Sequence, residues 1–129
     1  MKQHRNTRQR RLILEAVCAR SDHPTADQIY LDVRAVDKMI SRGTVYRNLN
    51  ILTHQGTLSH VKLPYTDRFE CNTRPHYHLH CTECDAVSDV TVSYQSELDK
   101  KVEDHTGYRI ERHRTIFEGI CPECQKKKD

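Results

Sequence analysis

Apolar positions in the first half of the chain repeat every three to four residues, which is the period of one face of a helix. The first such segment follows Thr7, a suitable N-cap, and the second follows Thr25. A third begins near Ser41 and ends at Gly56, a residue type common just after a helix. The expected buried faces are Leu12, Ile13, Ala16 and Val17; Ala26, Ile29, Tyr30 and Val33; and Val45, Leu49 and Leu52.

The pattern changes from helical to strand-like after Gly56. Thr57–Leu63 and Arg68–Cys71 are expected to be strands on either side of the turn-rich segment Pro64–Asp67. Three helices followed by a hairpin is the plan of a winged helix-turn-helix.

The second half predicts a strand, a strand, a helix and a strand, and hence an α/β (α+β) chain. The expected strands are His76–Cys81, Ala86–Val92 and Tyr108–Glu118, and the helix Ser93–Thr106 stops at Gly107. A frayed tail is expected at residues 126–128. The boundary is expected at Asn72–Pro75, which gives domains over residues 1–73 and 74–129.

Composition limits the size of the core. Only 36% of the 129 residues are hydrophobic and Trp is absent, so two small domains would need a metal, a disulfide or dimerisation for stability. The longest apolar run, Ala16–Ala19, is four residues, which excludes a transmembrane helix of about 20. The N-terminal residues lead into no apolar signal segment, so a cytoplasmic protein is expected.

The net charge of +3 conceals a division between the two halves. Residues 1–62 carry 11 Lys and Arg against 5 Asp and Glu, whereas residues 63–129 carry 10 against 13. A first half at +6 and a second half at −3 indicate two modules, the first of which faces a polyanion.

Two Cys-x-x-Cys pairs are the strongest chemical signal in the chain. Cys81, Cys84, Cys121 and Cys124 provide the four thiolates of a tetrahedral zinc site. Such a closed site has no open position for a substrate, so its role would be structural. The alternatives are free or disulfide-forming cysteines and a redox pair.

A histidine-rich segment is the second signal. On a strand, His76, His78 and His80 would share one face, close to Glu70 and Cys71, with Asp89 further along. Imidazoles with carboxylates suit Fe(II), Mn(II) or Zn(II), while the alternative is a solvated histidine-rich strand.

The third helical segment carries the residue types that read DNA. Its outward face is expected to offer Thr44, Tyr46, Arg47 and Asn48, and Arg and Asn side chains recognise guanine and adenine. Arg5, Arg8, Arg10 and Arg11 are expected before the first helix as phosphate contacts. The alternative is a solvated amphipathic helix. Cys18 is expected to be a small core residue.

Several stretches together resemble the ferric-uptake-regulator family of metal-dependent repressors, and most closely its peroxide-sensing branch. The resemblance covers about residues 7–124. It is carried by Thr7–Arg10, His23–Tyr30, Gly43–Leu49, Asp67–Glu70, His76-Tyr77-His78 with Cys81-x-x-Cys84, and Gly119–Cys124.

This resemblance implies a winged-helix DNA-binding domain and a small dimerisation domain, in a homodimer that binds a palindromic operator when loaded with metal. It implies structural zinc on the four cysteines. It also implies a regulatory Fe(II) or Mn(II) site between the domains, and contacts to DNA by Arg10, Thr44, Tyr46 and Arg47. The implied regulatory ligands are His23, Glu70, His76, His78 and Asp89.

Departures from the family pattern leave the signal open. The peroxide-sensing branch, in which a ligand histidine is oxidised, usually has Asp where this chain has Glu70. Cys71 suggests an alternative, a zinc-uptake regulator with Cys71 as a ligand, because a soft thiolate favours zinc. Tyr77 stands where other members place a further ligand, so their additional metal site is expected to be absent. A small metallohydrolase built on the histidines is a remote alternative, and no organic cofactor is expected.

Overall fold

The computed structural model describes residues 2–127, and side chains from residue 7 onward. Arg5 and Lys128, which figure in the expectations above, therefore lie outside the described side chains. The chain divides into two compact units, Met1–Thr73 and Arg74–Asp129, and each is described by itself.

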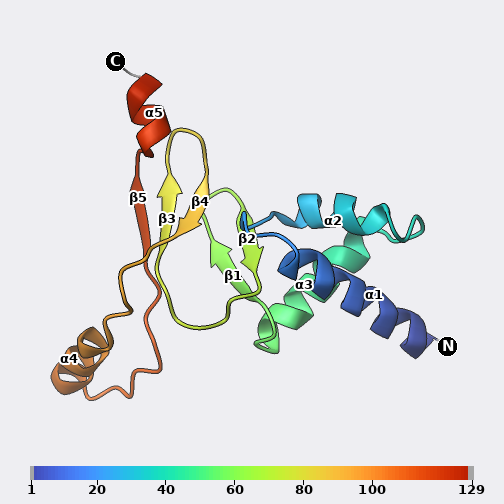
Figure 1. Cartoon of the computed structure of the whole chain (residues 1–129). Helices are drawn as coiled ribbons and strands as arrows, with labels where there is room; N and C mark the ends of the chain where they lie inside the picture. The colour runs from blue at the N-terminus through green and yellow to red at the C-terminus, as the bar shows by residue number, and fades with distance from the viewer. Residues whose placement is uncertain (1, 128–129) are drawn as a thin grey trace. The chain divides into compact units, whose positions relative to one another are not determined.

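The N-terminal unit has three helices followed by a hairpin (Figure 1). The helices are α1 (Lys2–Cys18), α2 (Ala26–Arg34) and α3 (Arg42–His54). The antiparallel strands β1 (Ser59–Lys62) and β2 (Asp67–Glu70) form the hairpin, with Ser59 opposite Glu70. The predicted winged-helix plan is confirmed.

The core of this unit lies among the three helices and is closed by the hairpin. The predicted buried face of α3 is confirmed, and β2 contributes Phe69. The residues of this core are Ile13, Val17, Ala26, Ile29, Val33, Ile40, Val45, Leu49, Leu52, Leu58 and Phe69.

Local hydrogen bonds explain where α2 and α3 begin and end. Thr25 caps α2 through a capping box, in which its hydroxyl accepts from the Gln28 backbone N–H and the Gln28 side chain accepts from the Thr25 N–H. The Ser41 hydroxyl accepts from the Thr44 N–H at the start of α3. Gly56 follows α3 with φ of +80°, a conformation that glycine adopts without steric cost. The expected cap at Thr7 is wrong, because α1 already begins at Lys2.

The C-terminal unit is a three-stranded sheet with two helices (Figure 1). Its strands are β3 (His78–Cys81), β4 (Val87–Asp89) and β5 (Ile116–Gly119), and the order is β4-β3-β5. The central strand β3 pairs antiparallel with β4 and parallel with β5. The helices are α4 (Ser96–Thr106) and α5 (Pro122–Lys127). The predicted stop of α4 at Gly107 is confirmed, and Gly107 has the left-handed conformation.

The expected strand over Tyr108–Glu118 is wrong for most of its length. Only Ile116–Gly119 forms β5, and several of the preceding backbone N–H groups donate to side chains instead of a neighbouring strand. The Ile110 N–H donates to Glu103 Oε1 at 2.9 Å, and the His113 N–H donates to the Tyr94 hydroxyl at 2.9 Å. The frayed tail expected at residues 126–128 is wrong for Lys126 and Lys127, which end a short helix, α5, and Lys128 lies outside the described residues.

Helix α4 lies at the end of two extended segments, away from the sheet of its own unit (Figure 1). No residue of α4 (Ser96–Thr106) is buried, and Leu98 and Val102, one turn apart, are 48% and 40% exposed. Among the described residues, no helix combines the length and apolar character needed to cross a bilayer.

Candidate metal centres and nucleic-acid interface

The four cysteines of the Cys-x-x-Cys pairs lie together at one end of the sheet. Cys81 ends β3, and the parallel pairing of β3 with β5 puts Cys81 opposite Gly119, two residues before Cys121. The four sulfur atoms all lie within 4.8 Å of one another, and Cys84 Sγ is 3.9 Å from Cys121 Sγ. Four sulfurs each about 2.3 Å from a central zinc ion would be about 3.8 Å apart, so the cluster fits such an ion.

Hydrogen bonds to sulfur prepare this cluster for a cation. The backbone N–H groups of Cys121 and Cys84 approach Cys81 Sγ at 3.4 and 3.5 Å. They lower the pKa of the Cys81 thiol to about 6, so this sulfur is a thiolate at neutral pH. The hydrogen bond with the Cys121 sulfur and burial raise the pKa of Cys124 to about 12. A bound dication would stabilise four thiolates held this close together.

Two predicted metal ligands, His23 and Glu70, meet inside the N-terminal unit. Both are buried, with 5% and 6% of their surface exposed, and His23 Nε2 lies 3.5 Å from Glu70 Oε1. Strand β2 holds the turn that carries His23, because Arg68 Nη1 donates to the His23 carbonyl at 3.2 Å and the Phe69 N–H donates to the Pro24 carbonyl.

The backbone at His23 adopts an uncommon conformation. Its φ of +54° lies in the left-handed region, which residues other than glycine seldom occupy. Such conformations persist where surrounding contacts impose them and cluster at functional sites. The sequence carried no signal for this conformation, since His23 resembles an ordinary turn residue before Pro24.

Three further predicted ligands meet inside the C-terminal unit. His78 lies directly opposite Asp89 in the β3–β4 register, and Asp89 Oδ1 is 3.5 Å from His78 Nε2 and 3.2 Å from His76 Nε2. The Arg74 carbonyl contacts His76 Nδ1, which leaves Nε2 as the nitrogen facing Asp89. These three side chains form a compact group of nitrogen and oxygen donors.

The expectation that His76, His78 and His80 share one face of a strand is wrong for His76 alone, since His78 and His80 lie two residues apart on β3. Strand β3 begins at His78, so His76 precedes it, and His80 Nε2 lies 3.0 Å from Asp85 Oδ1 instead. His80 therefore belongs with the turn between Cys81 and Val87 rather than with the histidine group.

Cys71, the proposed alternative metal ligand, forms a disulfide with Cys18. Their Cα atoms are 5.0 Å apart, and the bond joins the end of α1 to the residue after β2. A sulfur in a disulfide offers no thiolate to a metal, so the reading of Cys71 as a zinc ligand is wrong for this form of the chain. The expectation that Cys18 is a core residue is also wrong, because it is exposed.

Helix α3 presents a polar face to solvent. Tyr46 is 43% exposed and its hydroxyl donates to Asp27 Oδ1 at 2.9 Å, and this hydrogen bond raises the pKa of Tyr46 above its ordinary value. Arg42 forms an ion pair with the same carboxylate. Arg47 is also exposed, and its Nη2 lies 3.5 Å from the hydroxyl oxygen of Thr44. An arginine, a tyrosine and a threonine are thus accessible on one helix.

Asn48 does not belong to this exposed face, contrary to the expectation. It is buried, its amide donates to the Thr44 carbonyl, and its oxygen accepts from Arg10 Nε at 3.0 Å. Arg8, Arg10 and Arg11 lie within α1 rather than before it. Arg10 is therefore partly buried and tied to α3, which limits its freedom to reach a phosphate.

A polar network in the C-terminal unit has no counterpart among the predictions from the sequence. The Tyr77 hydroxyl lies 2.8 Å from His113 Nε2, and His113 Nδ1 lies 2.6 Å from Asp99 Oδ1. The Tyr94 hydroxyl also donates to Asp99. Burial and the Asp99 hydrogen bond raise the pKa of Tyr94, while the hydrogen bonds from Tyr94 and His113 lower the pKa of Asp99. The network joins the start of α4 to the sheet.

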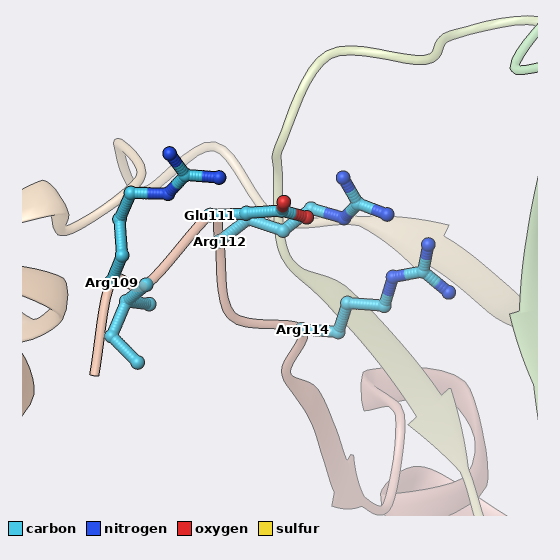
Figure 2. A pocket seen from close by; sticks show the side chains of 5 residues that line it. Arg109, Glu111, Arg112 and Arg114 are labelled. Atoms are coloured by element: carbon cyan, nitrogen blue, oxygen red, sulfur yellow. The ribbon is translucent and has the colours of Figure 1, made fainter.

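A shallow pocket lies on the segment that connects α4 to β5. Arg109, Ile110, Glu111, Arg112 and Arg114 line it. Figure 2 shows the guanidinium groups of Arg112 and Arg114 extending to the same side of this segment. The pocket includes none of the predicted metal ligands or DNA contacts.

The chain is similar to known proteins over most of its length. The model of the ferric uptake regulator family matches residues 1–118. The chain belongs to the ferric uptake regulator family. A curated relative, the peroxide-responsive repressor PerR of Staphylococcus aureus (strain USA300), is 34% identical over 126 residues, which cover 95% of this chain and 84% of the relative.

Solved structures of the ferric uptake regulator family show the same fold. The Campylobacter jejuni peroxide stress regulator has a TM-score of 0.81 at 26% identity and covers 95% of both chains. The Helicobacter pylori ferric uptake regulator has a TM-score of 0.79 at 22% identity, over 92% of this chain and 80% of that chain.

Membership of the ferric uptake regulator family settles the class of function. The chain is a transcriptional regulator and not an enzyme, so the metallohydrolase alternative is wrong. Regulators of this family bind DNA, bind metals and act as dimers.

Proposed function

We propose that this chain is a metal-dependent repressor of the peroxide-stress response. It would bind a palindromic operator as a homodimer, with structural zinc on the four cysteines and a regulatory Fe(II) or Mn(II). The observation that carries the proposal is the pair of buried His23 and Glu70, together with the separate group around Asp89. Residues 1–73 would form the DNA-binding domain and residues 74–129 the dimerisation domain.

The chemistry of the donors is compatible with Fe(II) or Mn(II) at the regulatory site. With Cys71 in a disulfide, the proposed ligands offer imidazole nitrogens and carboxylate oxygens alone, a set that suits Fe(II), Mn(II) and Zn(II). The proposed ligands are His23, Glu70, His76, His78 and Asp89. When iron is bound, it supplies the reaction with peroxide, and we propose His23 or His76 as the side chain that is oxidised.

One ion held by both groups would act as a switch. His23 and Glu70 belong to the unit with helix α3, whereas His76, His78 and Asp89 belong to the unit with the three-stranded sheet. A shared ion would restrict how the DNA-binding units are oriented in a dimer. A helix-turn-helix dimer needs its recognition helices about 34–36 Å apart to enter successive major grooves. Bound metal would therefore increase the population of dimers with this spacing.

The exposed apolar surface of the C-terminal unit supports dimerisation through that unit. Leu98 and Val102 on α4 and Phe117 on β5 are between 40% and 48% exposed, and Tyr108 is 72% exposed. A second copy would cover these side chains and supply the buried area that α4 lacks.

Metal-dependent DNA binding tests the switch. We expect operator affinity to rise when Mn²⁺ is added to zinc-loaded protein, and His78→Ala to abolish that rise while leaving the protein folded. His105→Ala is the control, because His105 is an exposed histidine on α4 whose ring contacts the Lys101 carbonyl. Equal operator binding with and without Mn²⁺ would refute the switch.

A DNA-binding assay with α3 variants tests the interface. Arg47→Ala should weaken specific binding by about 5- to 150-fold, the equivalent of about 1–3 kcal/mol for a lost bidentate contact to a base. Arg109→Ala, which removes the same charge from the other unit, is the control. The two variants should have the same zinc content. Equal losses of operator affinity in the two variants would show that Arg47 does not recognise DNA bases.

Mass spectrometry tests the response to peroxide. Fe(II)-loaded protein treated anaerobically with one equivalent of hydrogen peroxide should gain one oxygen atom on His23 or His76, and lose operator binding. Mn(II)-loaded protein should gain none. If the histidines of the iron-loaded protein stay unmodified, peroxide sensing is refuted and the protein is an iron-responsive repressor instead.

A further inference from the structure

The disulfide between Cys18 and Cys71 is the one pair of cysteines that the metal sites do not use. Cys18 is the last residue of α1 and Cys71 follows β2, 53 residues later in the sequence. Both residues are exposed, so oxidants and small thiols can reach them. The metal-dependent switch proposed above needs neither sulfur atom.

The environment of a DNA-binding regulator makes an exposed disulfide reversible. This step rests on the proposed function, which places the protein with the DNA it regulates. Where glutathione and thioredoxin keep thiols reduced, disulfides are usually transient and redox-sensing. Exposed disulfides are also the ones that thiolates reduce most readily. A permanent structural role is therefore the weaker explanation for this bond.

The bond lies beside the two metal-ligand candidates of the N-terminal unit. Glu70 directly precedes Cys71, and His23 follows Cys18 by five residues. The other ties between this loop and β2 are non-covalent. They are the hydrogen bonds of Phe69 to Pro24 and of Arg68 to His23, and the bridge between Thr25 and Arg68. The disulfide thus closes a short ring that includes both His23 and Glu70.

We propose that Cys18 and Cys71 are a reversible thiol–disulfide couple, which a hydroperoxide oxidises and whose disulfide form holds His23 and Glu70 in position for the regulatory metal. Oxidation state would then adjust metal affinity through a second input, separate from any oxidation of histidine. Cys18 and Cys71 are positioning residues in the disulfide form, because a sulfur in a disulfide offers no thiolate to a metal.

The redox step balances without iron. The thiolate of one cysteine attacks the O–O bond of the hydroperoxide, which gives a sulfenic acid and releases an alcohol, or water when the oxidant is hydrogen peroxide. The second thiol displaces water from the sulfenic acid and forms the S–S bond. The two thiols together lose two electrons and two protons. A dithiol reverses the reaction by two exchange steps and is itself oxidised to a disulfide.

The expected effect on metal affinity follows from restricting the ligands. When the disulfide is reduced, the loop with His23 and the end of β2 lose their covalent link, so ordering both ligands around an ion costs more conformational entropy. Changes in groups that orient metal ligands typically alter metal affinity by 10- to 100-fold. We expect Mn²⁺ to bind the disulfide form about 10-fold more tightly than the dithiol form.

The test uses full-length protein with zinc on the four cysteines and no iron. The protein is reduced with dithiothreitol, desalted anaerobically and treated with hydrogen peroxide, and its free thiols are counted by alkylation and mass spectrometry. Mn²⁺ affinity is then measured for the dithiol and disulfide forms from the electron paramagnetic resonance signal of free Mn²⁺. The double variant Cys18→Ser/Cys71→Ser is the control, and its affinity should not respond to redox treatment.

Each outcome decides the proposal. Loss of the two thiols of Cys18 and Cys71 on oxidation, with a rise of about 10-fold in Mn²⁺ affinity, supports it. Thiols that resist peroxide, a disulfide that resists dithiothreitol, or equal Mn²⁺ affinity in the two forms would overturn it and leave the proposed repressor function intact. Absence of Mn²⁺ binding in both forms would overturn the redox coupling and the proposed regulatory site together. The comparison of the two wild-type forms stands even if the double variant does not fold.

Discussion

The Cys18–Cys71 disulfide should contribute strongly to the stability of the N-terminal unit, and the double variant Cys18→Ser/Cys71→Ser measures that contribution. A cross-link between residues 53 apart removes loop-closure entropy from the unfolded chain. For a loop of that length, the chain-entropy relation gives about 14 cal/mol/K, or about 4 kcal/mol at 25 °C. Both cysteines are exposed, so the serine side chains should add little cost of their own.

Urea unfolding followed by circular dichroism measures this difference, because α1, α2 and α3 contain most of the helical residues. Oxidised wild-type protein should exceed the double variant by about 4 kcal/mol in the free energy of unfolding. With m values of about 1–3 kcal/mol/M, the midpoint would move by about 1.4–4 M urea. In dithiothreitol the two proteins should unfold together. A difference below about 1 kcal/mol under oxidising conditions would show that the bond does not constrain the unfolded chain as reasoned.

Three further predictions concern other contacts. Thr25→Ala removes the capping box with Gln28 and should lower the stability of the N-terminal unit by about 1 kcal/mol in the same urea assay, whereas Thr25→Ser should keep most of it. Asp99→Asn should lower the melting temperature at neutral pH. Tyr94 and His113 hold the pKa of Asp99 below its ordinary value. The ionised carboxylate therefore stabilises the fold at every pH above that ordinary pKa. That contribution disappears as pH falls through the lowered pKa, so the wild type and the variant should converge below about pH 4; a constant difference would contradict the assignment. Removal of metal from the four-cysteine cluster with a strong chelator should unfold the C-terminal unit, seen as lost sheet signal, and added zinc should restore it.

Local patterns in the sequence predicted the helices and the hairpin of the N-terminal unit. The spacing of Val45, Leu49 and Leu52 predicted the buried face of α3, and the cap at Thr25 and the stop at Gly56 follow from side-chain and backbone preferences of single residues. Such signals act over a few residues, so they can be read before the fold is known. The start of α1 shows the limit, because no local signal distinguishes Thr7 as a cap from Thr7 inside a longer helix.

Patterns were less informative for the C-terminal unit. The residues Tyr108–Glu118 have the composition of a strand, yet Glu103 and the Tyr94 hydroxyl take the backbone N–H groups that a neighbouring strand would need. A prediction from local preference does not include competition from side chains that are distant in sequence. The polar network at His113 could not be predicted for the same reason, because its members are distant in sequence.

Motifs in the sequence indicated the classes of chemistry without the fold. The two Cys-x-x-Cys pairs, the histidines at 76 and 78 and the basic first half predict a protein that binds metal and a polyanion. The tertiary structure alone decided which groups are available for those roles. It buries Asn48 against Arg10, joins Cys71 to Cys18, and sets His23 beside Glu70 in a left-handed backbone conformation. These outcomes depend on contacts between residues more than 30 positions apart, and the free energy of such a contact exists only once the chain has folded.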